Sequence, residues 1–237
     1  MLDIHSHFLP KMDDGSKSTE MSMQMLRESR KQGVTTIVST SHFYGDNEAP
    51  DRFLKRRRHA FEKLSPLLSD SEPEILLGAE VLYYPGISHS DSVTQLAIQG
   101  TDLILIEMPF VPWSDKIFDE LIAFQYNTGL RIILAHVERY QSIEKRDIYE
   151  RLFDQPFYFQ CNAEAFTSFR SRRLALRLMD SDLLHFIGTD CHNTDKRPPN
   201  MQEAQKIVEK KLSPADWRHF IKGCEQRFDR HRLSDTK

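Results

Sequence analysis

The sequence predicts an α/β fold, a barrel formed by seven consecutive β/α units. Short apolar runs rich in β-branched residues alternate with helix-like segments from one end of the 237-residue chain to the other. The run Leu103-Ile104-Leu105-Ile106 is continuously hydrophobic, as a parallel strand covered on both faces must be. Because this alternation occurs seven times, it favours a parallel sheet that closes into a barrel.

Seven segments have the length and composition of buried strands. They are residues 2–5, 35–40, 75–80, 103–107, 131–136, 157–161 and 185–190. Two of the stretches between them carry strong helix signals. Residues 20–32 and 118–127 place their apolar side chains on one face, and each stretch ends close to a glycine, Gly33 or Gly129, that suits the position after a helix.

No repeat, low-complexity tract or linker interrupts this alternation. Residues 1–237 are therefore expected to form one domain, with a flexible tail beyond about residue 228. One dense basic run, Lys55-Arg56-Arg57-Arg58, follows the second predicted strand. It is expected to be either the solvated face of a helix or a docking patch for an acidic partner.

The composition is that of a soluble globular protein, with 39% hydrophobic and 28% charged residues. No stretch approaches the ~18 consecutive apolar residues of a membrane span. A net charge of −3 gives no global reason to expect nucleic acid or an anionic membrane as a partner. The three cysteines are widely spaced and the first residues lack a secretory pattern, so the cytoplasm is the expected location.

Metal-binding side chains recur where the predicted strands end, which in an α/β barrel is where the strands open onto a common mouth. The nine candidates are His5, His7, Asp14, His42, Glu80, Glu107, His136, Asp190 and His192. A lone histidine at a strand end is usually structural. Recurrence on successive strands, however, favours a metal centre. Only the sixth strand offers no obvious ligand.

The kinds of ligand narrow the choice of metal. Imidazole and carboxylate without thiolate suit Mn²⁺, Fe or Zn²⁺ and disfavour a structural zinc site. With roughly three protein ligands per ion, nine ligands predict two or three ions, with Glu80 as a natural bridge. Two ions ~3.5–4 Å apart can clamp the attacking and leaving oxygens of a phosphoryl displacement. The expected reaction is hydrolysis in which hydroxide on the metal, and no protein side chain, is the nucleophile.

A set of motifs in the same order resembles the PHP (polymerase and histidinol phosphatase) superfamily. It is most similar to the bacterial manganese-dependent protein-tyrosine phosphatases encoded with capsule and exopolysaccharide genes. The motifs are Asp3-Ile4-His5-Ser6-His7, Asp13-Asp14-Gly15, the segment 32–42, Gly78-Ala79-Glu80, Ile106-Glu107, Ala135-His136-Val137-Glu138-Arg139-Tyr140 and Asp190-Cys191-His192-Asn193 with Arg197-Pro198-Pro199. The resemblance covers residues 1 to about 215 and implies a distorted, TIM-like (β/α)₇ barrel of the PHP type.

The resemblance also implies three divalent ions, Mn²⁺ before Fe, Zn or Mg. It assigns His5, His7, Glu80 and Asp190 to the first ion, Glu80, Glu107 and His136 to the second, and Asp14, His42 and His192 to the third. Arg139 and Arg197 become the residues that bind phosphate, because a guanidinium matches phosphate oxygens bidentately. The implied substrate is phosphotyrosine on a tyrosine autokinase that controls capsular or exopolysaccharide synthesis.

Two other activities stay open at this point. The same barrel could hydrolyse a small phosphate monoester such as histidinol phosphate. A PHP nuclease is less favoured because the chain is short and acidic. Cys191 and Arg197 also have the C-x5-R spacing of thiol-based tyrosine phosphatases. The intervening residues contain an aspartate and no glycine, whereas an anion nest needs inward-pointing amides, so we interpret the spacing as a coincidence.

Overall fold

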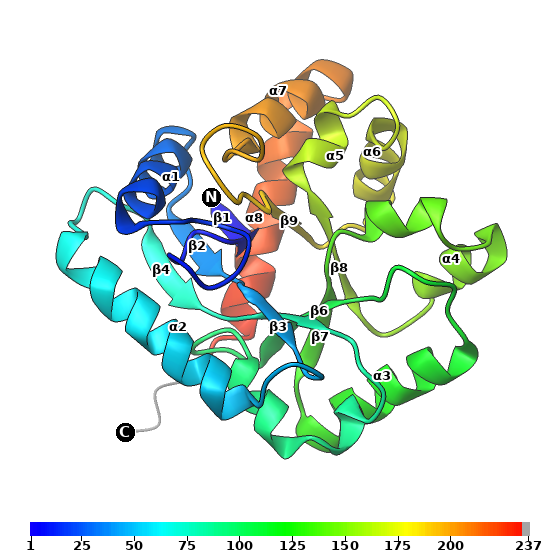
Figure 1. Ribbon diagram of the computed structural model, residues 1–237. Helices are drawn as coiled ribbons and strands as arrows, with labels where there is room; N and C mark the ends of the chain where they lie inside the picture. Colours follow the sequence, from blue (N-terminus) through cyan, green and yellow to red (C-terminus); the bar gives the residue numbers. More distant parts are fainter. Residues whose placement is uncertain (234–237) are drawn as a thin grey trace.

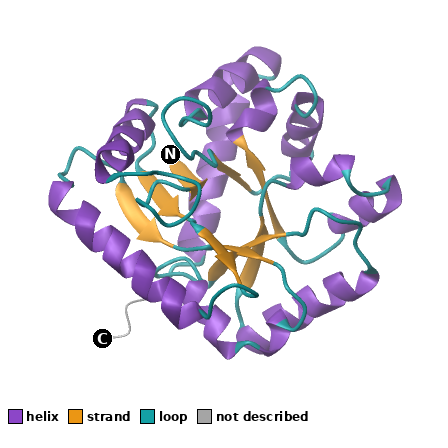
Figure 2. Cartoon of the chain, in the orientation of Figure 1, coloured by secondary structure: helices purple, strands orange, loops and turns teal. Residues whose placement is uncertain are grey.

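The strands lie at the centre of the fold, and every pair of neighbouring strands is parallel. The computed structural model describes residues 1–233. In Figure 1, α1, α2, α3, α4 and α6 surround the strands, and Figure 2 shows the same separation of inner strands from outer helices. The strands are β1 (Leu2–Ser6), β2 (Thr36–Ser39), β3 (His42–Tyr44), β4 (Glu74–Leu77), β5 (Glu80–Leu82), β6 (Leu103–Glu107), β7 (Arg131–Leu134), β8 (Tyr158–Asn162) and β9 (Phe186–Gly188).

Six of the seven β/α units contain α-helices. These are α1 (Thr19–Lys31), α2 (Pro50–Leu64), α3 (Asp115–Thr128), α4 (Arg146–Leu152), α5 (Ala163–Thr167), α6 (Arg172–Asp180), α7 (Met201–Lys211) and α8 (Pro214–Arg230). The predicted ends of α1 and α3 are confirmed, since Gly33 and Gly129 have φ of 87° and 73°, a conformation that glycine adopts at little cost. The third crossover instead has 3₁₀ turns at Ile87–His89 and Asp91–Leu96.

Two of the predicted strands are each divided into two short strands. β1, β2 and β4 form one sheet in that order, whereas β3 and β5 begin a second sheet ordered β3-β5-β6-β7-β8-β9. At the break, the Glu80 amide donates to the carbonyls of Thr40 and Ser41, 3.1 and 3.2 Å away. The prediction that His42 and Glu80 end their strands was therefore wrong, because each of them begins a new strand.

The two sheets meet again between β1 and β9. Ser6 and Cys191 form a parallel bridge, the Asp190 amide donates to the His5 carbonyl at 2.7 Å, and the His7 amide donates to the Cys191 carbonyl at 2.9 Å. These few contacts take the place of a regular ladder. The predicted α/β class and TIM-like barrel are confirmed, and this seam and the divided strands are what distort the barrel.

Residues 229–233 are more ordered than the sequence predicts. We expected flexibility beyond about residue 228, yet α8 continues to Arg230 and Arg232 bridges Thr101. The Leu233 amide then donates to the Gly100 carbonyl at 2.8 Å. The rest of the predicted tail, residues 234–237, lies outside the described part of the chain. No helix among residues 1–233 is both long and apolar enough to cross a membrane.

Candidate metal centre

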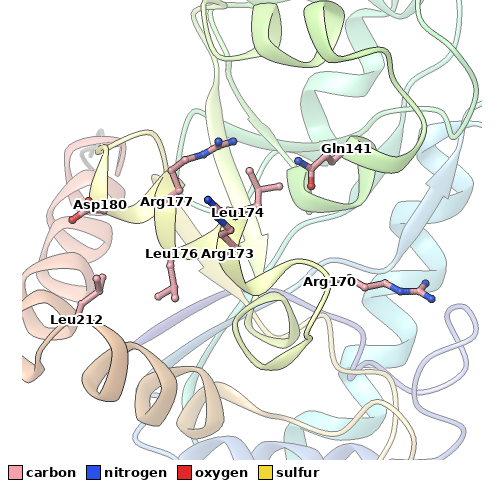
Figure 3. A pocket seen from close by; sticks show the side chains of 8 residues that line it. All are labelled: Gln141, Arg170, Arg173, Leu174, Leu176, Arg177, Asp180 and Leu212. Atoms are coloured by element: carbon pink, nitrogen blue, oxygen red, sulfur yellow. The ribbon is translucent and has the colours of Figure 1, made fainter.

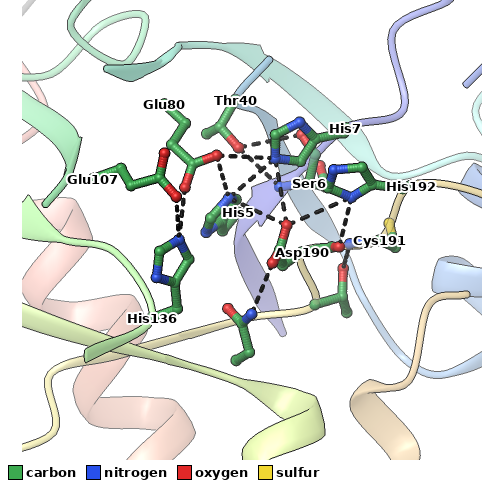
Figure 4. Close-up of polar contacts among 12 residues, drawn as sticks. His5, Ser6, His7, Thr40, Glu80, Glu107, His136, Asp190, Cys191 and His192 are labelled. Atoms are coloured by element: carbon green, nitrogen blue, oxygen red, sulfur yellow. Dashed lines mark hydrogen bonds and ion pairs between the residues drawn. The ribbon is translucent and has the colours of Figure 1, made fainter. Parts of the chain in front are cut away.

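The nine predicted ligands meet in one place, at the mouth formed by the carboxyl ends of the main strands and the start of β3 and β5. Figure 4 shows most of them, with imidazole and carboxylate groups from β1, β5, β6 and the segments after β7 and β9 directed toward one another. All are buried except His42, which is partly buried, and Asp14, whose side chain is 65% exposed. Burying so many ionisable groups together is unfavourable unless they are paired or coordinate a cation.

The imidazoles are oriented as metal ligands are. The Nδ1 atoms of His5, His7 and His192 lie 3.2, 2.9 and 2.9 Å from a Gln160 amide oxygen, an Asp13 carboxylate oxygen and the Asp190 carbonyl. Because each of these acceptors needs a proton on Nδ1, the Nε2 atom of each ring is left with its lone pair facing the mouth. Second partners of this kind fix both the tautomer and the ring orientation in metal sites.

Glu80 lies at the middle of the cluster. Its Oε2 atom is 3.3 Å from the Nε2 atoms of both His5 and His7 and 2.9 Å from His42 Nδ1. Nevertheless this buried oxygen and His42 Nδ1 have no hydrogen-bond partner in acceptable geometry. Short distances without alignment are expected when several lone pairs point at a common ion. The donor set therefore fits divalent cations.

Three overlapping groups of ligand atoms each lie within 4.8 Å of one another. They are His7 with Asp14, His42 and His192; His5 with His7 and Asp190; and His42 with Glu80 and Glu107. His136 Nε2 is 2.9 Å from Glu80 Oε1 and 3.2 Å from Glu107 Oε1. The residues assigned to each ion by the family resemblance are thus neighbours in the structure, and His7 and His42 each belong to two groups.

The backbone at two ligands is strained. His136 and Asp190 have φ of 30° and 51°, values that residues with a Cβ adopt rarely and at a cost of ~1–3 kcal/mol each. Close packing is also required beside His5, because a Cβ on Gly188 would lie 2.4 Å from the His5 Cβ. The fold maintains these conformations where the ligands must point inward, as is common at functional sites.

Amide side chains of β8 support the ligands from behind. Gln160 Oε1 accepts from the His136 amide at 2.7 Å and faces His5 Nδ1, while its Nε2 donates to Asn162. Asn162 in turn donates to Asp190 Oδ2 at 2.8 Å. The sixth predicted strand provides orientation where it offers no ligand. Sequence reasoning missed this role, although residues 160 and 162 share one face of the strand.

Asp13 is a second residue that sequence reasoning missed. Its carboxylate accepts from His7 Nδ1, from the Gly15 amide and from the His42 amide, each at 2.9 Å. Burial opposes the charge, but the hydrogen bond and charge of His7 outweigh it and hold the pKa of Asp13 below its usual value. The Asp13-Asp14-Gly15 motif therefore combines a candidate ligand with the residue that orients two others.

Asp13→Asn is expected to weaken metal binding by about 10–100-fold while leaving the fold intact, because partners behind metal ligands typically contribute that much. The check is a titration of the metal-free protein with Mn²⁺, followed by activity. High Mn²⁺ should restore most of the rate. Asp70→Asn, at an exposed position, is the control. Normal Mn²⁺ affinity in Asp13→Asn would show that Asp13 does not position the ligands.

Arg139 and Arg197 lie at the rim. Each places an Nη2 atom 2.7 Å from Asp190 Oδ2, and their side chains are 34% and 35% exposed. Burial opposes the charge on Asp190, but the imidazoles of His5 and His7 together with Arg139 hold its pKa well below the usual range. Two guanidinium groups thus lie beside the ligands and face a cavity of about 380 Å³.

Cys191 does not have the surroundings of a nucleophile. The thiol is fully buried, and burial together with the neighbouring Asp3 carboxylate raises its pKa far above the usual value. The amides of Asp195, Lys196 and Arg197 all donate to Asn193 Oδ1 at 2.8–3.2 Å. They are not available to bind a phosphate as the amides of a thiol phosphatase loop would be.

We therefore expect Cys191→Ser to retain activity within about tenfold of wild type, since that corresponds to a barrier change of only ~1.4 kcal/mol. The measurement is kcat on an aryl phosphate for protein whose metal content has been checked. A loss of several orders of magnitude with metal retained would instead identify Cys191 as the nucleophile.

Residues 1–223 match the family model described as capsular polysaccharide synthesis, CpsB/CapC. The chain belongs to the CpsB/CapC family. This confirms the family that the motifs in the sequence predicted, and the match covers every candidate ligand and both arginines of this CpsB/CapC protein.

Curated relatives of this CpsB/CapC chain are similar over nearly their whole length. Tyrosine-protein phosphatase CpsB of Streptococcus pneumoniae is 34% identical over 229 residues, which cover 89% of this chain and 90% of the relative. Tyrosine-protein phosphatase YwqE of Bacillus subtilis is 31% identical over 222 residues, covering 90% and 85%. A solved structure from work on YwqE and the pneumococcal CpsB, described as unique metal-dependent tyrosine phosphatases, matches with a TM-score of 0.82 at 24% identity, covering 98% and 96% of the two chains. That likeness shows a common fold.

Proposed function

We propose that this protein is a metal-dependent protein-tyrosine phosphatase. The observation that carries the proposal is the convergence of nine candidate ligands, eight of them buried or partly buried, at one mouth whose cavity is also lined by Arg139 and Arg197. The relatives named as tyrosine-protein phosphatases support it over nearly the whole chain. We propose Mn²⁺ as the metal and two to three ions as the number, with the ligands grouped as the family resemblance implies.

Divalent ions held by these residues would supply Lewis-acid stabilisation of the phosphoryl oxygens and an activated water. Glu80 presents one oxygen to His136 and the other to His5 and His7, so it is placed to bridge two ions. Arg139 and Arg197 bind Asp190 in the absence of substrate, and each guanidinium has further N–H groups with which to hold a phosphate. Their charge would stabilise the additional negative charge of the transition state.

An aromatic wall favours an aryl phosphate as the substrate. Tyr44 and Phe110 line the cavity and are 37% and 48% exposed. Their rings stack beside His42 and His136, with centroid distances of 5.4 and 5.9 Å. Exposed aromatic faces next to the ligands can pack against a phenyl ring. In histidinol phosphate the phosphate is attached to an aliphatic carbon and the imidazole lies several bonds away, so its ring would not be held beside the phosphoryl group as a phenyl ring is.

The test is hydrolysis of a phosphotyrosine peptide, a phosphoserine peptide and histidinol phosphate by the same preparation. Chelation is expected to abolish activity, and Mn²⁺ is expected to restore it best among common divalent ions. The phosphotyrosine peptide should be the preferred substrate. Full activity in metal-free protein would refute metal dependence, and a preference for histidinol phosphate would favour the alternative monoester phosphatase.

As the physiological substrate we propose a tyrosine autokinase that controls capsular or exopolysaccharide synthesis, in line with the family description. That the basic run on α2, Lys55–Arg58, docks this autokinase stays a prediction. Arg57 donates to the Gly78 carbonyl at 2.7 Å, and Arg56 donates to Met12 and Glu48. Within that run, Lys55 and Arg58 are therefore the residues left to contact a partner.

A further inference from the structure

A second group of arginines lies outside the metal centre, on α6 and the turn before it. Its members are Arg170, Arg172, Arg173 and Arg177. Within residues 1–233, no ion pair or hydrogen bond from these side chains to a carboxylate is found, whereas Arg146, Arg151 and Arg232 each have an acidic partner within 3.5 Å. Four unneutralised arginines in a chain of net charge −3 form a local positive patch.

This patch lines cavities that lead away from the metal centre. A cavity of about 440 Å³ shares Phe110 and Arg139 with the mouth and extends to Arg170. A further cavity of about 550 Å³ shares Gln141 and Arg170 with it and is lined by Arg173 and Arg177. Figure 3 shows this outer cavity, with both arginines on α6 and Gln141 on the opposite side. The three cavities share lining residues and so lie next to one another, and we refer to them together as the groove; the middle cavity is also lined by Glu138 and Glu164, so the excess of positive charge lies in the outer one.

The charge of the outer cavity is positive overall. Its arginines, Arg170, Arg173 and Arg177, face one acidic residue, Asp180, which lies at its far end. Two arginines also occupy the first turn of α6, which contains no acidic residue, and Ser171 provides no side-chain cap. Cations at the amino end of a helix oppose its dipole. An anion bound there would relieve both the repulsion among the arginines and the unfavourable helix end.

We infer that this groove binds an acidic segment of the substrate polypeptide, next to the phosphotyrosine whose phosphoryl group lies at the metal centre. The inference rests on the proposed function. The bound groups would be carboxylates, which guanidinium groups hold by charge-assisted hydrogen bonds. The consequence of the inference is a preference for phosphotyrosines that stand in acidic sequences.

The test uses phosphotyrosine peptides with a glutamate-rich flank on one side or the other, the same peptides with glutamine, and a peptide with a second phosphotyrosine. Wild type should show a KM lower by roughly fivefold or more for an acidic peptide at low salt, with kcat similar. Arg173→Gln/Arg177→Gln should remove that difference and leave the kinetics of a small aryl phosphate unchanged. Arg30→Gln/Lys222→Gln, at exposed positions on α1 and α8, removes the same charge and should keep the preference.

Equal KM values for acidic and neutral peptides in wild type would overturn the inference, as would a preference that survives in Arg173→Gln/Arg177→Gln. A lower KM for the doubly phosphorylated peptide alone would identify the occupant as a second phosphoryl group. If no phosphotyrosine peptide is hydrolysed, the proposed function fails. The groove is then tested separately by fluorescence anisotropy of the unphosphorylated acidic and neutral peptides, where equal affinities would refute it.

Discussion

Glu80→Ala is expected to lose its bound metal and its activity together, with kcat falling by about 1,000-fold or more. Residues that only hydrogen-bond to metal ligands already change metal affinity or activity by ~10–100-fold when mutated. Glu80 should matter more, because one of its oxygens faces His136 and the other faces His5 and His7. Without it, two candidate ion sites lose a carboxylate at once. Elemental analysis of the purified variant and a rate on an aryl phosphate, taken from the same sample, provide the measurement.

Glu203→Ala is the matched control for Glu80→Ala, because Glu203 is exposed on α7 and is not one of the candidate ligands. It should have wild-type metal content and rate. A Glu80→Ala protein that keeps its full number of ions and its rate would mean that the cluster at the mouth is not the active centre.

Arg139→Ala is expected to lower kcat by ~100-fold or more with metal content unchanged, since one preorganised contact to transition-state charge is typically worth that much. Arg139 binds Asp190 only through Oδ2, whereas Asp190 Oδ1 faces the imidazoles of His5 and His7. Removing the guanidinium therefore leaves the ligand oxygens in place. The result to measure is kcat on metal-loaded protein.

Arg146→Ala controls for the loss of an arginine, because the Arg146 side chain is 89% exposed and, among residues 1–233, forms an ion pair only with Glu150. It should behave as wild type. Arg139→Lys should recover part of the rate, since an ammonium keeps the charge but not the bidentate geometry. If Arg139→Ala were fully active beside an inactive Cys191→Ser that retains its ions, the metal-based mechanism would be overturned.

Eight of the nine candidate ligands could be selected from the sequence because each lies at or near the end of a hydrophobic run, and such runs mark parallel strands; Asp14 lies in the loop after the first run. The division of two strands into β2 and β3 and into β4 and β5 could not be predicted. Thr40-Ser41 and Gly78-Ala79 separate β2 from β3 and β4 from β5, and small residues within an apolar run carry no periodic signal. The crossover between β5 and β6, which contains 3₁₀ turns, could not be predicted either, because it is as long as a crossover that contains an α-helix.

The supporting residues were missed for a different reason. His5 and Gln160 are 155 positions apart, so their contact depends on how the barrel closes and not on any local pattern. Asp13 lay inside a recognised motif, but its role follows only from the direction of its carboxylate toward His7 and His42. The arginine groove likewise exists only after η4 (Val137–Ser142) and α6 are packed side by side.

The seam between β1 and β9 also determines at which stage of folding the candidate metal centre can form. Asp190 follows His5, and His192 follows His7, by 185 positions in the chain. Contacts over such sequence separations form late, because closing long loops is entropically unfavourable. An incomplete chain therefore holds only fragments of the ligand set. Divalent ions bound by these residues would link β1 to the segment after β9 and so stabilise the closed barrel. The capacity for hydrolysis would therefore arise only once the barrel has closed.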